Sequence, residues 1–345
     1  MRTLKAFALG LTVATGLLAG AVSAEPIVIK LGHSSEGDIR LPGSGRTACV
    51  AAMKNYLEVA SNGEILLEAH PDGALGNPRT MIESAQTGVI QMVGAYTSIM
   101  VPFAPEISVT QIPYLFRDNL TAWKVMDGPL GDELAESFLK KTGLRVLAWP
   151  EGAGFRNIYT EKPIHSPADL KGMKMRVPEN PGLLAMFRAW GTNTVTITWS
   201  ELYTSLQSGM AEGHDTELYS MYSKKLYEVN PYVTVTRHSY NLHPILINEE
   251  FFQSLSPKNQ TLILQAGDLC NRVGNAQSLL SSLVVKEAME AEGAKFYYPN
   301  DDEIEQFRSL GQQPYIDTIV RKIGDDGQAW VDRAMAAAKQ AEMSQ

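Results

Sequence analysis

Arg176 is the residue whose type and position point most clearly to chemistry. It lies in the segment 166–178, which reads S-P-A-D-L-K-G-M-K-M-R-V-P. Ser166 and Asp169 have the spacing of a capping box around one helical turn, and Gly172 suits the left-handed residue that ends such a turn. The alternation that follows predicts a strand with Arg176 at its carboxyl end, where ligands of open α/β sheets bind. Because a guanidinium fits a carboxylate with two hydrogen bonds, Arg176 is predicted to hold an acidic small molecule rather than a structural ion pair.

Arg156 and Trp199 are the next candidates for contact with that ligand. Arg156 begins a predicted strand, and it either supports the carboxylate or pairs with Asp215 or Glu217. Those two acids belong to the polar run 214–217, which either lines a site or caps the helix that follows it. Trp199 lies in T-W-S-E, which has the spacing of a capping box, and an aromatic ring in a first helical turn is often half exposed. We therefore expect Trp199 to face the ligand.

Three further polar residues follow predicted strands in the first third of the chain. His33 and Ser34 come after the strand 27–32, and Tyr96 comes after the strand 89–95. The carboxyl ends of parallel strands meet at one edge of a sheet, so these residues are site candidates as well. For His33 a solvated or hydrogen-bonded loop residue is the favoured interpretation, and it remains a candidate because it adjoins Ser34.

Enzymatic and metal-dependent functions find little support in the sequence. No H-E-x-x-H or G-x-S-x-G pattern is present, and the glycine pair at 152 and 154 lacks the strand–turn–helix context of a dinucleotide loop. No nucleophile, acid–base pair or metal set is recognisable. We expect no catalytic residues, no metal and no cofactor.

The composition and the N-terminal segment indicate an exported, soluble, acidic protein. Residues 1–24 resemble a secretory signal, with Arg2 and Lys5 before an apolar run and a small-residue cleavage site that ends at Ala24; the alternative is an uncleaved anchor. Removing these two basic residues and no acidic ones changes the formal charge from −8 to −10. An acidic chain without a basic run argues against nucleic acid or anionic membrane as a partner. Cys49 and Cys270 are interpreted as two buried, unpaired cysteines, although export also permits a disulfide.

The hydrophobic periodicity predicts an α/β protein with two lobes. Strands and helices alternate as β-α-β-α-β over 27–95, which is typical of a parallel sheet. The glycine-rich segment 151–154 is predicted to be a flexible crossing between lobes, and the strand 243–248 is predicted to return the chain to the first lobe. A helix from Pro257 to Glu292 would be about 50 Å long and could lie across both lobes.

The chain closely resembles the DctP-type solute-binding proteins of TRAP (tripartite ATP-independent periplasmic) transporters. The resemblance rests on H-P-D-G-A-L-G at 70–76, E-S-A-Q-T-G at 83–88, P-Y-L-F-R-D at 113–118, the segment 166–178 and W-S-E-L-Y-T-S-L-Q-S-G at 199–209. It implies a type II periplasmic-binding-protein-like fold with a ligand enclosed at the hinge of two lobes. We expect one lobe to comprise 25–153 and 242–281, and the other 154–241 and 282–345. It also implies a periplasmic monomer that delivers its ligand to membrane permease subunits.

The same resemblance assigns residues to the site. Arg176 takes the place of the arginine that pairs with the ligand carboxylate, Arg156 that of a second arginine, and Trp199 that of an aromatic residue that packs on the ligand. Thr216 stands where many members have asparagine, and Glu217 where many have proline. The remaining candidates for ligand contact are Ser34, His33, Tyr96, Asp215 and His238.

The hydroxyl and imidazole groups among these candidates favour a sugar acid as the ligand. A C4-dicarboxylate is the second choice. A lobed sensor that presents its closed form to a receptor is an alternative function, and an exported enzyme on the same fold is a remote one.

Overall fold

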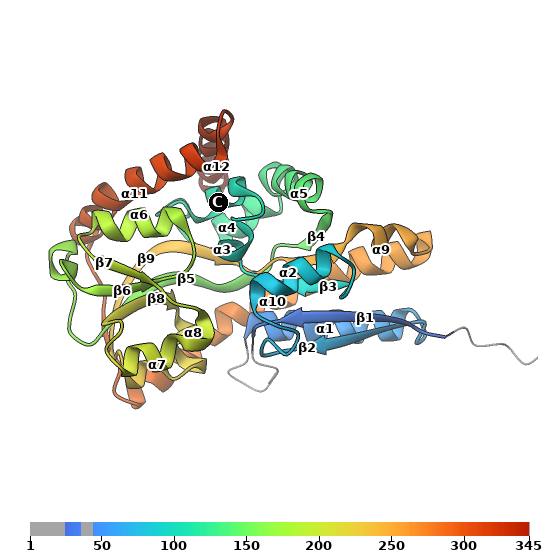
Figure 1. Cartoon of the computed structure of the whole chain (residues 1–345), viewed down its shortest axis with the longest axis horizontal. Coiled ribbons are helices and arrows are strands. Elements are labelled where there is room, and N and C mark those ends of the chain that lie inside the picture. Colours follow the sequence, from blue (N-terminus) through green and yellow to red (C-terminus); the bar gives the residue numbers. More distant parts are fainter. Residues whose placement is uncertain (1–24, 36–43, 345) are drawn as a thin grey trace, which may run out of the picture.

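The structure, a computed structural model, describes residues 25–35 and 44–344, so the predicted signal segment 1–24 lies outside the described residues. The chain forms two sheets with helices around them, which confirms the predicted α/β class (Figure 1). The strands are β1 (Ile27–His33), β2 (Ile65–His70), β3 (Met92–Gly94), β4 (Leu144–Ala148), β5 (Glu151–Thr160), β6 (Lys174–Val177), β7 (Asn193–Thr196), β8 (Gly213–Glu217), β9 (Tyr232–Leu242), β10 (Ile245–Asn248) and β11 (Lys295–Tyr297).

The helices surround both sheets (Figure 1). The α-helices are α1 (Gly45–Ala60), α2 (Pro78–Gln86), α3 (Thr97–Met100), α4 (Asn119–Met126), α5 (Pro129–Thr142), α6 (Pro181–Ala189), α7 (Leu202–Gln207), α8 (Leu218–Ser223), α9 (Glu249–Ser254), α10 (Pro257–Ala291), α11 (Asp301–Ile323) and α12 (Gly327–Met343). The 3₁₀ turns are η1 (Pro105–Gln111), η2 (Pro167–Leu170), η3 (Trp199–Glu201) and η4 (Leu226–Glu228).

The first sheet has the strand order β2-β1-β3-β10-β4. β1 pairs in parallel with both β2 and β3, as the β-α-β-α-β pattern predicts, whereas β10 runs antiparallel between β3 and β4. Leu31 of β1 and Leu67 of β2 are buried with Met53 and Leu57 of α1 in one apolar cluster. Burial of these faces fixes the parallel sheet and leaves the ends of β1 and β3 at one edge.

The second sheet has the order β11-β9-β5-β8-β6-β7 and contains the segment around Arg176. The predicted turn forms as η2, in which Ser166 and Asp169 make the capping box, and Gly172 adopts a φ of 78°. β6 follows and pairs in parallel with β7 and β8. The predicted local path to Arg176 is therefore confirmed, with a 3₁₀ turn rather than an α-helical one.

Two long strands connect the sheets. β4 and β10 pair in the first sheet, and their continuations β5 and β9 pair antiparallel in the second (Figure 1). The chain passes from β4 of the first sheet to β5 of the second at 151–154, where a crossing was expected. These residues are the start of the strand β5 rather than a flexible passage, with an irregularity in the pairing with β9 between Glu151 and Gly154. β9 ends in the second sheet at Leu242, and the strand predicted at 243–248 forms as β10 in the first sheet. The polar run 214–217, expected before a helix, is the buried strand β8.

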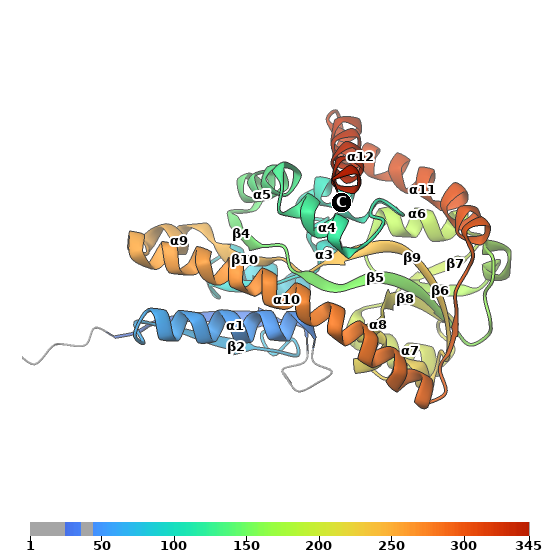
Figure 2. The ribbon, with the colours of Figure 1, turned by 180° about the vertical axis from the view of Figure 1, so that it is seen from behind.

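The long helix is confirmed as α10, which begins at Pro257 after the N-cap Ser256 and ends at Ala291. Figure 2 shows it crossing the back of the molecule, beside α1 at one end and past β5 and α8 toward the other. A helix of 35 residues is about 52 Å long, enough to contact elements of both sheets. α12 packs against α4 and α5. The lobe boundaries expected from the sequence stay a prediction.

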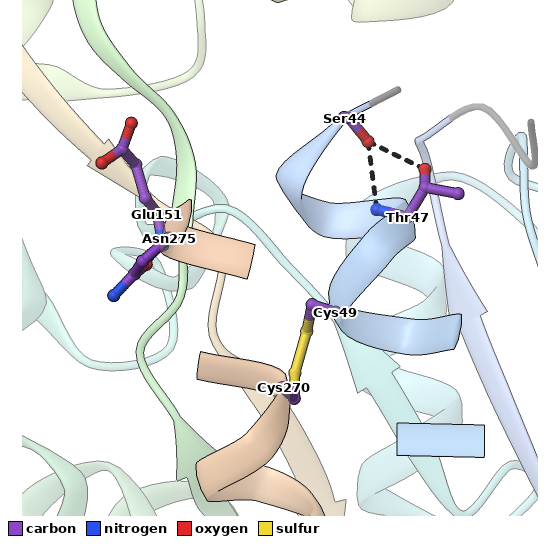
Figure 3. Close-up of a disulfide and its surroundings, with 6 residues drawn as sticks. All are labelled: Ser44, Thr47, Cys49, Glu151, Cys270 and Asn275. Atoms are coloured by element: carbon purple, nitrogen blue, oxygen red, sulfur yellow. Dashed lines mark hydrogen bonds between the residues drawn. A yellow bond between two sulfur atoms is a disulfide. The ribbon is translucent and has the colours of Figure 1, made fainter. Parts of the chain in front are cut away.

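A disulfide joins α1 to α10 through Cys49 and Cys270, so the interpretation of two unpaired cysteines is wrong (Figure 3). The two helices pack closely because small residues face each other, with Gly274 next to Cys49 and to the backbone of Gly45. This packing places the sulfur atoms of Cys49 and Cys270 side by side, although 221 positions separate the two cysteines in the chain. Within the described residues, every helix is too short or too polar to cross a membrane.

Candidate functional site

A cavity of about 720 Å³, here called the outer cavity, opens between elements of the two sheets. A recess of about 60 Å³ adjoins it and extends among buried residues. Both spaces share the residues Ser34, Pro78, Ile99, Arg176, Pro178 and Trp199. Ser34 follows β1, and Pro78 and Ile99 belong to α2 and α3, whereas the last three lie on β6, just after it and on η3. Both halves of the molecule therefore contribute to this site.

Arg176 lies on β6, is 4% exposed and faces both spaces. Its Nε donates to the carbonyl oxygen of Ile197 at 2.9 Å, and within the described residues its terminal nitrogens have no carboxylate partner. Burial and the nearby charge of Arg156 lower the pKa of Arg176 to about 10, so the guanidinium is charged at neutral pH. A buried cation without a counter-ion is unfavourable, and an anionic ligand would relieve that cost.

Arg156 also lines the recess, but it is already paired. Its Nε donates to Oδ2 of Asp215 at 2.6 Å, and its Nη1 donates to Oε1 of Glu217 at 3.2 Å. The backbone carbonyl of Asp215 accepts a third bond, from Nη2, at 2.6 Å. β5 and β8 bring the three residues together, since Arg156 lies opposite Glu217 in the antiparallel pair. Of the two interpretations of Arg156, the structure shows the ion pair, and contact with a ligand stays a prediction.

Trp199 is half-buried at the start of η3 and borders both spaces, in agreement with the expected half-exposed ring. The expected capping box is absent: Oγ1 of Thr198 donates to Oε2 of Glu201 at 2.6 Å and makes no bond to the backbone of the turn. The turn is 3₁₀, and α7 begins only at Leu202. The position of Trp199 therefore depends on the path of the chain after β7.

The other candidates divide into two groups. Ser34, Tyr96, Thr216 and Glu217 line the recess together with the two arginines and Trp199. Asp215, His238 and His33 border neither space. Which of these residues touch a ligand stays a prediction.

The second group lies behind the site rather than in its wall. Nε2 of His238 is 3.3 Å from Oδ2 of Asp215, the same oxygen that accepts from Nε of Arg156. Burial raises the pKa of Asp215, but Arg156 and the bond from His238 more than offset it and hold that pKa well below its usual range. Burial, with smaller contributions from Arg46 and His70, lowers the pKa of His33 to about 4. Of these residues, Asp215 orients the wall directly, through its bond from Arg156.

Several residues of the recess were not expected from the sequence. Ser98, Ser220 and Asn241 line it, the last from β9. Asn241 stands just before the predicted strand 243–248, so its place within β9 became visible only in the structure. Ser98 and Ser220 carried no signal in the sequence either. Within the described residues, no group of three or more His, Cys, Asp or Glu side chains is arranged to hold a metal.

Comparisons with known proteins identify the family. A family profile described as "Bacterial extracellular solute-binding protein, family 7", named DctP, matches residues 44–322. The chain is 32% identical over 234 residues to the 2,3-diketo-L-gulonate-binding periplasmic protein YiaO of Escherichia coli, a match that covers 67% of this chain and 70% of that protein. It is 30% identical over 208 residues to the C4-dicarboxylate-binding protein DctB of Bacillus subtilis, covering 60% and 59% of the two chains.

A solved structure agrees with these matches. The sugar acid binding protein DctPAm from Advenella mimigardefordensis, in complex with galactonate, superposes with a TM-score of 0.85 at 27% identity, over 92% of this chain and 99% of that chain. The profile match, the two-sheet fold and the solved relative agree. The chain belongs to family 7 of the bacterial extracellular solute-binding proteins, the DctP family.

Proposed function

We propose that this protein is the extracytoplasmic solute-binding subunit of a TRAP transporter and captures a small organic acid. The observation that carries the proposal is Arg176, a buried and charged guanidinium that borders a cavity and has no carboxylate partner within the described residues. An arginine in that setting offers parallel donors to a carboxylate. The ligand carboxylate is therefore proposed to dock on Arg176.

Capture would proceed by closure of the two halves. The outer cavity is bordered by Ser34 and Ile99 on one side and by Arg176 and Trp199 on the other. A ligand held by Arg176 and packed on Trp199 gains its contacts with the first group only when the halves approach. Those additional contacts favour the closed state by the same free energy that they add to binding.

A sugar acid is the favoured ligand class. The recess wall carries the hydroxyl groups of Ser34, Tyr96, Ser98, Thr216 and Ser220, which suit a hydroxylated carbon chain. The Escherichia coli relative and the solved relative are named for sugar acids. A C4-dicarboxylate is the second candidate, since the Bacillus subtilis relative is named for that class.

Location and partners follow from the family. We infer that residues 1–24 direct export to the periplasm and are removed after Ala24, and that the loaded protein docks on TRAP membrane subunits as a monomer. A binding rather than a catalytic role is inferred because the family profile and the relatives are those of solute-binding proteins.

Calorimetry on Arg176 variants tests the proposal. A thermal-shift screen of organic acids identifies the ligand, since binding to the folded state raises the melting temperature. Arg176→Ala should then weaken binding by about 2–5 kcal/mol, because the ligand carboxylate would be buried without its cation. Arg176→Lys should recover only part of this loss, since an ammonium cannot form the paired hydrogen bonds.

Arg188→Ala is the matched control. Arg188 is an exposed arginine on α6, and its replacement removes the same charge without changing the cavity wall. It should leave the dissociation constant within about twofold, as expected for a solvent-screened charge. Near-normal affinity of both Arg176 variants would refute the proposed carboxylate clamp.

A further inference from the structure

Glu217 is an acidic side chain in the wall of a site that is proposed to bind an anion. It is the last residue of β8, is 1% exposed and lines the recess beside Arg156 and Arg176. Its orientation toward the recess calls for a physical explanation.

Glu217 is held ionised by its neighbours. Oε1 accepts from Nη1 of Arg156 at 3.2 Å and from Nδ2 of Asn241 at 2.6 Å, and Oε2 accepts from Oγ1 of Thr216 at 2.9 Å. Burial raises the pKa of Glu217, but the charges of Arg156 and Arg46 and the bond from Asn241 outweigh it, so the pKa lies below its ordinary value. The backbone N–H of Glu217 also donates to this carboxylate, while Thr216 is the side chain among the described residues that donates to Oε2. A ligand hydroxyl would add to these donors.

The charges around the two spaces balance before any ligand enters. Among the described residues, the lining side chains that are basic are Arg79, Arg156, Arg176 and Lys224, and those that are acidic are Asp72, Glu179, Glu201 and Glu217. Arg156 is further neutralised by Asp215 behind it. Arg176 is thus the buried cation that is available to a ligand in the described part of the site. One carboxylate satisfies it, and a second would lie beside the ionised carboxylate of Glu217.

The recess also contains an unsatisfied hydroxyl group. Oγ of Ser220 is buried, lines the recess and has no hydrogen-bond partner within the described residues. Ser220 is 1% exposed and follows Glu217 by three positions, at the start of α8. A buried polar atom without a partner is costly, so a ligand group that both donates and accepts would suit it. An alcohol can donate to Glu217 and accept from Ser220, whereas a carboxylate cannot donate.

We propose that Glu217 is a specificity-determining residue that restricts the site to ligands with a single carboxylate and a hydroxylated opposite end. The inference rests on the proposed capture of an organic acid by Arg176. It adds that the hydroxylated end enters the recess, donates to Glu217 and bonds to Ser220. A dicarboxylate of the same length would bring its second negative charge to Glu217 and would be rejected by like-charge repulsion.

Matched pairs of aldonates and aldarates test the proposal, because each pair shares a carbon skeleton and differs in the second carboxylate. Calorimetry on the full-length mature protein would compare gluconate with glucarate and galactonate with galactarate. The variants would then be measured with the pair that binds more tightly to the wild-type protein. We expect the aldonate to bind at least about tenfold more tightly. Glu217→Gln should reduce this ratio at least about fivefold, mainly by strengthening aldarate binding.

Two further variants test whether the change in the binding ratio comes from the recess. Glu161→Gln removes one exposed negative charge from the surface and should leave the ratio within twofold. Ser220→Ala removes a hydroxyl without a protein partner, so it should leave the melting temperature unchanged or higher and weaken aldonate binding about fivefold. Ser220→Ala keeps the test decisive if Glu217→Gln does not fold.

The outcomes separate this inference from the function on which it rests. The role of the recess would be overturned if the two acids bound equally or if the aldarate bound more tightly. It would also be overturned if folded Glu217→Gln kept the same ratio or if Ser220→Ala bound the aldonate normally. Each of these results would leave acid capture intact. Failure of every organic acid in the preceding screen to bind would instead reject the proposed function, and this inference with it.

Discussion

Arg156 and Arg176 carry the same charge on neighbouring parts of one sheet, yet their surroundings give them different tasks. Asp215 and Glu217 surround Arg156, and burial alone would lower its pKa, but these acids raise that pKa above its ordinary value. Arg176 has only a carbonyl partner among the described residues and remains electrostatically unsatisfied. Arg156 therefore joins β5 to β8 in the recess wall, whereas the terminal nitrogens of Arg176 are the donors proposed for the ligand carboxylate.

Replacement of Arg156 should test its structural role. Arg156→Met would leave the buried carboxylates Asp215 and Glu217 without their cation, and we expect the free energy of unfolding to fall by about 3–5 kcal/mol. Urea unfolding followed by circular dichroism measures the change. Arg145→Met is the matched control, because Arg145 pairs with Glu249 in a half-exposed position and should contribute only about 1 kcal/mol. Similar losses in both variants would contradict the distinction between buried and exposed pairs.

At the scale of elements, the contact between α1 and α10 fixes the long helix to the first sheet. Small residues permit the close approach: a Cβ added to Gly45 would meet Gly274 and Ser278 of α10. The disulfide between Cys49 and Cys270 lies in the same contact, and both cysteines are fully buried (Figure 3). α10 is therefore anchored near its middle by packing and a covalent bond, and it also contacts β5 and α8.

Loss of the disulfide should destabilise the protein without changing its fold. The bond closes a loop of 221 positions, and removing a native disulfide typically costs about 2–5 kcal/mol through the greater freedom of the unfolded chain. We expect the Cys49→Ala, Cys270→Ala double variant to unfold at a lower urea concentration by that free energy. Wild-type protein in a reductant that opens the bond should approach the double variant. An unchanged midpoint in both experiments would show that the bond contributes no net stability.

For the molecule as a whole, buried histidines link stability to pH. Burial lowers the pKa of His33 to about 4 and that of His214 to about 3, and it places the pKa of His243 well below its ordinary value. In the unfolded chain these imidazoles titrate near pH 6.5. Below that pH the unfolded state binds protons that the folded state does not, so acidification favours unfolding.

The free energy of unfolding should therefore decline as the pH falls from about 6.5 to about 4. Each buried histidine contributes a slope of about 1.4 kcal/mol per pH unit at most. Urea unfolding at pH 7, 6 and 5 measures this slope. His214→Asn should reduce it by about one histidine's share, whereas replacement of the exposed His165 by glutamine serves as the control. A flat profile over this range would contradict the linkage.

Features that depend on neighbouring residues followed from the sequence alone. The capping box of Ser166 and Asp169, the strand that carries Arg176, the extent of α10 and the family resemblance are all encoded by short-range spacing, which sets caps and hydrophobic periodicity. The strand β11 and the extended conformation of 151–154 were missed, because pairing with β9 stabilises them more than their own residues do.

Only the tertiary structure decided how distant residues meet. Arg156 and Asp215 are 59 positions apart, and the two cysteines 221, so their pairing depends on strand register and helix packing rather than on local pattern. The same register places Glu217 in the recess beside Arg176, and the helix α8 that follows places Ser220 there. The sequence by itself indicated Arg176 as the cation that is proposed to bind a carboxylate. The fold determined which charges remain uncompensated around it, because the free energy of a buried charge depends on all the groups packed against it.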